Sequence, residues 1–203
     1  MSTARWVDAG CKTIAEAKDQ GRACPVLDRL IHPPTIAAVG RANIGKSSLL
    51  NTLVGQRVAL VADVAGTTRD HVGVPVDLGG LVVRWIDTPG IDERIGDGEE
   101  IEIATRVVAH ADLIVHCIDA LDDAGKMDAR LRSVIDPGVE IVRVGMRSDL
   151  GDHPSGVETR VCTRSKAEGI GELVTLIRDR LVPANEVADP TPWRFWASLG
   201  VDA

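Results

Sequence analysis

The sequence predicts an α/β protein, with a mostly parallel sheet and helices on both of its faces. Three observations predict this fold class. From residue 35 onward, short apolar runs alternate with helical stretches, which is the pattern of strand–helix–strand units. Hydrophobic residues make up 44% of the 203 residues, enough for a well-buried core. Aromatic residues make up only 2%, so aliphatic side chains must fill that core, as in a parallel sheet covered by helices.

The apolar runs give the expected strands, at residues 35–39, 58–61, 72–78, 81–86, 113–118, 139–144 and 157–161. The clearest expected helix covers residues 169–181, where apolar side chains recur at helical spacing: Ile170, Leu173, Val174, Ile177 and Leu181. Residues 99–110 show a similar pattern. These elements account for most of the segment 34–182, which we expect to be the main domain.

Two flanks fall outside this pattern. Residues 1–33 are expected to form a helical extension, with a short helix opened by Pro25 and stopped by Pro33 and Pro34. Residues 183–203 are expected to form a tail rich in aromatic residues. Such a tail either docks a partner or folds back on its own domain, and both interpretations stay open.

Charge and composition exclude several classes of protein. The formal net charge of −7 argues against a broad electrostatic grip on nucleic acid or on an anionic membrane. The four cysteines lie far apart, as in proteins of a reducing compartment. The N-terminal residues are charged rather than apolar, and no apolar run approaches the roughly 20 residues of a membrane span. We therefore expect a soluble, cytoplasmic protein.

A phosphate-binding loop follows the first strand of the main domain. Residues 40–47 read GRANIGKS, which fits G-x-x-x-x-G-K-[ST] with a strand before it and a helix after it. Gly40 and Gly45 let the backbone turn its N–H groups toward phosphates, and the helix adds the positive end of its dipole. Lys46 is expected to reach the β- and γ-phosphates, and the Ser47 hydroxyl to bind Mg²⁺. The motif alone does not separate a GTPase from an ATPase or a kinase.

A second stretch suits the metal side of the same site. Residues 87–90 read DTPG directly after an apolar strand. Asp87 can hold Mg²⁺ through water, opposite the Ser47 hydroxyl. Gly90 can offer its N–H to the γ-phosphate and act as a pivot when that phosphate leaves.

A third stretch lies between these two. Residues 65–70 read AGTTRD, and the adjacent Thr67 and Thr68 can supply a hydroxyl to Mg²⁺ and an N–H to the γ-phosphate. Such a segment is ordered by a triphosphate and loosens after hydrolysis. Its position between the other two motifs is what makes this interpretation strong.

Together these motifs resemble the TrmE–Era branch of P-loop GTPases. The resemblance covers roughly residues 34–182 and rests on GRANIGKSSLLN, AGTTRD and DTPG; the text between them is most similar to GTPase domains of the TrmE type. It implies a Ras-like fold with a six-stranded sheet, GTP and GDP as nucleotides, and slow GTP hydrolysis. It also implies a link to tRNA modification or to ribosome and RNA biology, and pairing of two GTPase domains. It does not identify a protein or RNA partner, and we expect no association with a membrane.

The resemblance also implies how hydrolysis is assisted. The family's phosphate-loop Asn, matched by Asn43, helps bind K⁺ in the place of an arginine finger. Ile91 stands where Ras-type enzymes carry a water-orienting Gln, and an aliphatic side chain cannot orient water. In TrmE-type domains a Glu further along takes that role, and Glu99 is the matching position. The alternative is that Glu99 is only an acidic residue of a helix N-terminus.

The guanine-binding motif departs from the family, because residues 146–149 read MRSD where the family has Asn-Lys-x-Asp. Asp149 can still accept two hydrogen bonds from guanine, which rejects adenine. Met146 cannot make the contacts of the family's Asn, whereas the flat guanidinium of Arg147 can lie over the base. Losing one or two hydrogen bonds is expected to cost about 1–3 kcal/mol, roughly ten- to a hundredfold in affinity. Thr163 and Arg164 stand where the family has Ser-Ala-Lys, so backbone contacts to the base are expected there.

The expected site residues fall into three groups. The catalytic residues are Lys46, Thr68 and Glu99. The nucleotide-binding residues are Gly40, Asn43, Ile44, Gly45, Lys46, Ser47, Ser48, Thr67, Thr68, Asp87, Gly90, Arg147, Asp149, Thr163 and Arg164. The metal ligands are Ser47, Thr68 and Asp87 for Mg²⁺ and Asn43 for K⁺.

Two other interpretations stay open. The altered base motif and the missing Gln fit a non-hydrolysing nucleotide-binding module that scaffolds partners. An ATP-dependent P-loop kinase fits less well, because the paired threonines and DTPG are typical of a switch GTPase. The sequence shows nothing similar to the folate-binding domain, the helical domain or the C-terminal Cys-x-Gly-Lys of the complete tRNA-modification enzyme. We therefore do not expect this chain to carry out that modification alone.

Overall fold

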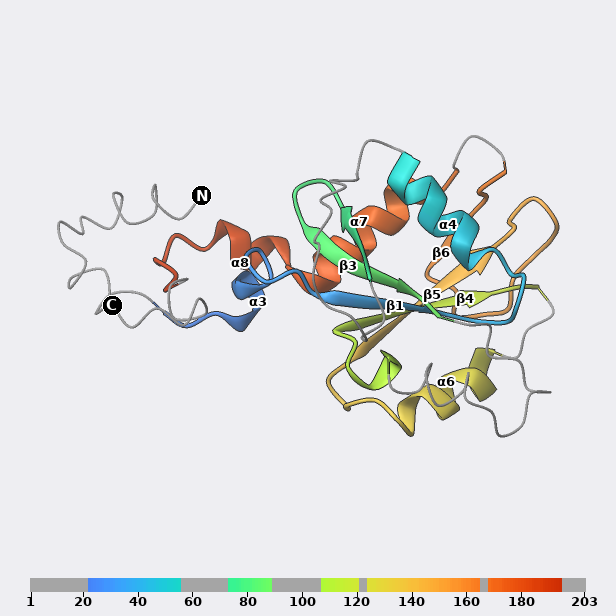
Figure 1. The fold of residues 1–203 in the computed structure, drawn as a ribbon, viewed down its shortest axis with the longest axis horizontal. Helices are drawn as coiled ribbons and strands as arrows, with labels where there is room; N and C mark the ends of the chain where they lie inside the picture. The colour runs from blue at the N-terminus through green and yellow to red at the C-terminus, as the bar shows by residue number, and fades with distance from the viewer. Residues whose placement is uncertain (1–21, 56–72, 89–106, 121–123, 165–167, 195–203) are drawn as a thin grey trace. The chain divides into compact units, whose positions relative to one another are not determined.

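The computed structural model of the chain describes residues 22–55, 73–88, 107–120, 124–164 and 168–194 (Figure 1). The chain divides into two compact units. The larger unit is Pro34–Arg178, and the terminal unit joins Met1–Pro33 to Asp179–Ala203.

A six-stranded sheet forms the centre of the larger unit, in the order β2-β3-β1-β4-β5-β6. Its strands are β1 (Thr35–Val39), β2 (Val74–Asp77), β3 (Val82–Asp87), β4 (Leu113–Ile118), β5 (Glu140–Met146) and β6 (Thr159–Val161). The hairpin strand β2 pairs antiparallel with β3, and the other described pairings are parallel. The expected α/β fold with a mostly parallel sheet is confirmed.

Helices cover both faces of this sheet. Helices α4 (Lys46–Leu53) and α7 (Ile170–Leu181) lie on one face and α6 (Ala124–Arg132) on the other (Figure 1). On the α6 face a buried cluster joins Ala37, Val39, Ile114 and Ile141 of the sheet to Val108, Ala111, Leu131 and Ile135. On the other side, α4 buries Leu49 and Leu53, and α7 buries the expected Ile170, Leu173, Ile177 and Leu181. Aliphatic side chains thus supply most of the core, as the composition predicts.

The expected strands 35–39 and 113–118 are confirmed at both ends, and the other described strands differ by one or two residues at their ends. The expected strand 58–61 lies outside the described residues. So does the expected helix 99–110, apart from its last turn, where residues 107–109 are helical. Two described helices were not expected: α6, and α8 (Ala184–Ala188) within the expected tail.

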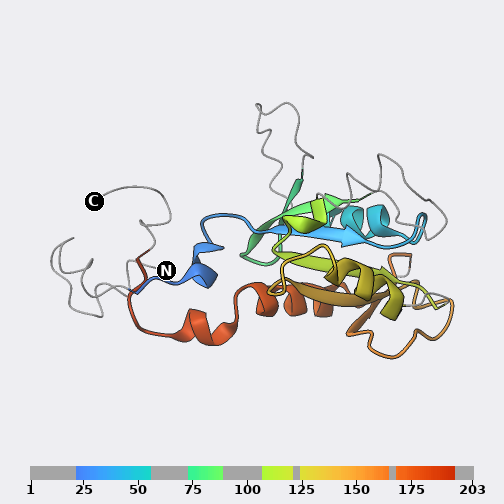
Figure 2. The same ribbon diagram turned by 90° about the horizontal axis from the view of Figure 1, so that it is seen from below.

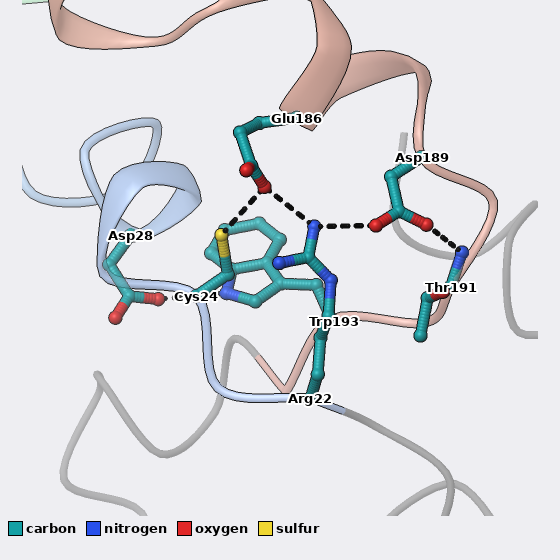
Figure 3. Close-up of polar contacts among 7 residues, drawn as sticks. All are labelled: Arg22, Cys24, Asp28, Glu186, Asp189, Thr191 and Trp193. Atoms are coloured by element: carbon teal, nitrogen blue, oxygen red, sulfur yellow. Dashed lines mark hydrogen bonds and ion pairs between the residues drawn. The ribbon is translucent and has the colours of Figure 1, made fainter.

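The terminal unit joins the two flanks of the main domain through polar contacts (Figure 3). Arg22 Nη2 lies 2.8 Å from Glu186 Oε2 and 3.1 Å from Asp189 Oδ2. Trp193 Nε1 donates a hydrogen bond to Asp28 Oδ1 at 2.8 Å, at the end of α3 (Pro25–Asp28). Trp193 is buried, so this part of the aromatic segment folds onto its own chain.

Candidate nucleotide-binding site

The residues with binding chemistry follow the carboxyl ends of parallel strands. Figure 2 shows the ribbon of the sheet and its helices in a second view. Gly40 follows β1 and Asp87 ends β3, while the residues beyond β4, β5 and β6 continue the same edge. Because parallel strands end at one edge of a sheet, the chain brings these segments together, and ligands of open α/β sheets bind at that edge.

The phosphate loop closes tightly on the sheet. Gly40 has a φ of +147°, and a Cβ there would lie 2.5 Å from the Cys117 carbonyl oxygen, so the loop requires glycine at this position. Gly45 has a φ of +111° and caps the N-terminus of α4 in the left-handed conformation. Asn43 is also left-handed, with a φ of 60°, which asparagine tolerates better than most residues. Burial raises the pKa of the Cys117 thiol to about 12, so this cysteine is a neutral core residue.

Lys46 lies inside the turn of the loop. Its ammonium donates to the carbonyl oxygens of Gly40 at 3.2 Å and Arg41 at 3.0 Å, and the residue is 6% exposed. Burial lowers the pKa of Lys46, and the negative charge of Asp87 opposes that shift. A buried cation at a helix N-terminus, surrounded by loop amides, is an arrangement suited to phosphate groups.

Ser47 and Asp87 meet beside this lysine. The Ser47 hydroxyl donates to Asp87 Oδ2 at 2.5 Å. The other carboxylate oxygen, Asp87 Oδ1, is buried and has no hydrogen-bond partner among the described residues. Thr88 anchors the strand end, because its hydroxyl donates to the Ala38 carbonyl oxygen at 2.7 Å. A hydroxyl beside a carboxylate with one unsatisfied buried oxygen suits Mg²⁺, which prefers hard oxygen ligands.

The expected base motif forms a loop between β5 and the residues before β6. Met146 is 1% exposed, and its terminal methyl lies 3.4 Å from the position a Cβ on Gly45 would occupy. His153 Nε2 donates to the Met146 carbonyl oxygen at 2.7 Å, and the Leu150 N–H donates to the Arg147 carbonyl oxygen at 2.9 Å. The methionine therefore contacts the phosphate loop through apolar atoms, at the position where the family motif has a polar Asn.

Asp149 and Arg147 each have a partner from another strand end. The Cys162 thiol, directly after β6, donates to Asp149 Oδ1 at 3.3 Å. The Arg147 guanidinium forms an ion pair with Asp119, directly after β4. The structure thus brings Arg147 and Asp149 to the strand edge that also carries the phosphate loop.

The structure describes some of the other predicted residues but not all of them. Ile44 is buried, Ser48 is exposed in the first turn of α4, and Thr163 and Arg164 follow Cys162 at the end of β6. Thr67, Thr68, Gly90 and Glu99 lie outside the described residues. The sequence interpretation missed Asp119 and Cys162, which belong to no motif; the one signal was their position directly after an expected strand.

This fold and this loop define a P-loop nucleotide-binding protein, with a phosphate loop after β1 and a carboxylate, Asp87, at the end of β3 that contacts Ser47 of the loop. The family model described as 50S ribosome-binding GTPase matches residues 35–144. The chain belongs to this family, and it is a GTP-binding, GTP-hydrolysing enzyme of the TrmE–Era type.

Curated relatives support the same assignment. The chain is 38% identical to the tRNA modification GTPase MnmE of Acidiphilium cryptum over 157 residues, which is 76% of this chain and 34% of that protein. It is 37% identical to MnmE of Burkholderia thailandensis over 125 residues, 61% of this chain and 27% of that protein. The chain therefore spans about a third of the length of these relatives.

Solved structures share the fold. Era in complex with MgGDPNP and a fragment of 16S ribosomal RNA is 27% identical, with a TM-score of 0.52 over 71% of this chain and 55% of that chain. The cytosolic domain of the T. maritima FeoB iron transporter is 20% identical, with a TM-score of 0.56 over 74% of this chain and 64% of that chain, and this likeness shows the fold alone. Within the described part of the chain, no helix combines the length and apolarity that a membrane crossing requires.

Proposed function

We propose that this chain is a Mg²⁺-dependent, K⁺-stimulated GTPase switch. The observation that carries the proposal is the contact of Ser47 with Asp87 beside the buried Lys46. One hydroxyl, one carboxylate and one cation lie together at the loop, and this set suits the terminal phosphates of GTP and their Mg²⁺. Membership of a GTPase family supports this function over the non-hydrolysing module.

The residues of the loop divide the binding of GTP between them. Lys46 would exchange its two carbonyl partners for phosphate oxygens, and the amides from Gly40 to Ser47 would surround the β-phosphate. Ser47 and Asp87 would hold Mg²⁺, which neutralises negative charge on the β- and γ-phosphates when bound. Thr68 would complete that ligand set, as the resemblance implies.

Potassium stimulation rests on Asn43. This residue is exposed and its backbone is left-handed within the phosphate loop, so its side chain is accessible to a cation from solvent. The family resemblance implies that K⁺ there supplies positive charge in the place of an arginine finger. Glu99 would orient the attacking water, since Ile91 cannot.

A phosphate-release assay in KCl and in NaCl, with Mg²⁺ and GTP, tests the proposal. We expect faster turnover in KCl, and we expect Asn43→Ala to remove most of the difference between the two salts while GDP still binds. Asn51→Ala is the matched control, because Asn51 is exposed on α4, beyond the loop. Equal, negligible turnover in both salts would contradict potassium stimulation.

The wider role follows the relatives. Their name ties them to tRNA modification, and we propose that this chain acts in tRNA or ribosome biology with other proteins that supply the modification chemistry. We also propose that two copies pair through their GTPase domains in the transition state. Light scattering with GDP and aluminium fluoride should give the mass of a dimer in K⁺ and of a monomer in Na⁺; a monomer in both salts would contradict pairing.

A further inference from the structure

The base loop contains an arginine that the motif does not explain. Arg147 occupies the lysine position of the family motif, and its backbone is left-handed at a φ of 57°. That conformation is costly for a residue with a long side chain, so the surrounding structure must hold it. The turn bond from the Leu150 N–H to the Arg147 carbonyl oxygen holds its backbone, and Asp119 holds its side chain.

The ion pair between Arg147 and Asp119 is partly shielded from water. The Arg147 side chain is 36% exposed and the Asp119 side chain 18% exposed. Shielded charges attract each other more strongly than a surface pair does. The two residues meet because β4 and β5 are parallel neighbours, with Ile118 paired to Gly145, so the residues that follow each strand leave the same edge.

Only part of the guanidinium is occupied by this contact. Arg147 Nη2 bonds Asp119, whereas Arg147 Nε is buried and has no hydrogen-bond partner among the described residues. The ion pair with Asp119 holds the plane of the guanidinium in one orientation. A planar guanidinium held in this way can stack on a flat aromatic ring. Asp149 is two residues further along the same loop, and its carboxylate is held by Cys162.

We propose that Asp119 is a positioning residue for the nucleotide base: it orients the Arg147 guanidinium so that it stacks on the guanine that Asp149 recognises. This inference rests on the proposed GTP-binding function. The arginine then supplies contact energy that Met146 cannot, since Met146 reaches only the phosphate loop. The stacking arginine and the aspartate that orients it therefore come from two different strand ends.

A double-mutant cycle tests the proposal by calorimetry, with GDP as ligand and Mg²⁺ and K⁺ present. The variants are Asp119→Asn, Arg147→Met and the two combined. We expect each single variant to bind GDP about fivefold to tenfold more weakly, and the double variant no more weakly than Arg147→Met, because the two side chains act as one unit. Asp119→Glu, which keeps the carboxylate, is expected to restore most of the affinity.

Two controls separate positioning from a general effect on folding. Inorganic pyrophosphate has no base, so its affinity should stay unchanged in all of these variants. Asp77→Asn should bind GDP as the wild type does, because Asp77 serves the β2–β3 turn by accepting a hydrogen bond from the Gly80 N–H at 2.6 Å. If Asp119→Asn does not fold, Arg147→Met and Asp119→Glu still report on GDP against pyrophosphate.

The proposal is overturned if Asp119→Asn binds GDP normally, if GDP and pyrophosphate affinities fall together, or if the single effects add in the double variant. A wild type that binds pyrophosphate but not GDP would overturn the proposed guanine-nucleotide function itself. The two failures are distinguishable, because the first occurs with normal GDP binding by the wild type.

Discussion

Lys46 and Ser47 illustrate how much of this site is set by single residues. Lys46 is buried, and among the described residues its ammonium donates only to backbone carbonyl oxygens, which phosphate oxygens can replace. Ser47, in the first turn of α4, donates to Asp87 at the end of β3, so one hydroxyl links the phosphate loop to the proposed metal side. Both contacts are made by residues of short sequence motifs, which is why the sequence could single out these residues; their roles with phosphate and Mg²⁺ stay predictions.

Replacing Lys46 by alanine should remove most of the affinity for GDP and GTP. A charge-assisted contact to the phosphates is lost, and we expect at least a hundredfold weaker binding, about 3 kcal/mol. Calorimetry with GDP measures it. Lys126→Ala, on the exposed side of α6, is the matched control and should bind like the wild type. Unchanged affinity of Lys46→Ala would mean that the phosphates bind elsewhere.

Cys162→Ala should reduce the preference for GDP over IDP. The thiol orients the Asp149 carboxylate, and IDP lacks the 2-amino group that needs both carboxylate oxygens in place. We expect the ratio of the two affinities to shrink about threefold, with GDP losing more than IDP. Competition binding measures the ratio, and Cys162→Ser, which keeps a donor, should restore it. A ratio that is the same in all three proteins would show that the thiol does not position Asp149.

Between elements, a buried polar network ties α6 to the sheet. Asp128 of α6 accepts from His116 Nδ1 of β4 at 2.8 Å and from Arg143 Nε of β5 at 2.5 Å. His116 is 3% exposed and Asp128 8% exposed. The network sits on the same face as the aliphatic cluster, so it fixes the position of α6 as well as its burial.

Asp128→Ala should lower the free energy of unfolding by about 3 kcal/mol, because it leaves a buried histidine and an arginine without their acceptor. Urea denaturation followed by circular dichroism measures this change. Asp136→Ala, an exposed residue after α6, should leave stability within about 0.5 kcal/mol of the wild type. Equal midpoints for the two variants would show that the network contributes nothing to stability.

The same elements show where sequence interpretation succeeds. Strands β1 and β4 are mostly apolar runs with clear boundaries: Pro34 and Gly40 flank β1, and Asp112 and Asp119 flank β4, so both limits were predicted. Helix α6 was missed because its nine residues, AGKMDARLR, offer few apolar side chains and its fixing contact is an aspartate. Asp119 was missed for a related reason: a single aspartate after a strand has no pattern, and only the parallel pairing of β4 and β5 reveals its partner.

At the scale of the whole molecule, the two flanks of the main domain form one unit. We call the contacts of Arg22 with Glu186 and Asp189 the Arg22 clasp (Figure 3). Backbone bonds support it, from the Arg22 N–H to the Pro192 carbonyl oxygen at 2.9 Å and from the Arg194 N–H to the Arg22 carbonyl oxygen at 3.0 Å. The clasp therefore ties the segment before the main domain to the segment after it.

The Arg22 clasp should make stability depend on pH in the acid range. Hydrogen bonds from Arg22 and Cys24 lower the pKa of Glu186 below its ordinary value of 4.5. A carboxylate with a lowered folded pKa stabilises the fold above the unfolded pKa, and this stabilisation is lost as the pH falls through the folded pKa. The stability difference between wild type and Glu186→Gln should therefore be present at pH 7 and shrink below about pH 4.5. Urea denaturation at several pH values measures it, and a difference independent of pH would contradict the clasp.

The most direct test of the account is a calorimetric titration of the wild type with GDPNP in K⁺ buffer, with Mg²⁺ and then with EDTA. The contact of Ser47 and Asp87 beside Lys46 predicts binding that weakens at least tenfold when Mg²⁺ is removed, because the γ-phosphate then loses its metal. The Asp149 carboxylate, which is expected to select guanine, also predicts far weaker binding of the matching adenine nucleotide. No binding of GDPNP in the presence of Mg²⁺, or equal affinity for the guanine and adenine nucleotides, would contradict the account.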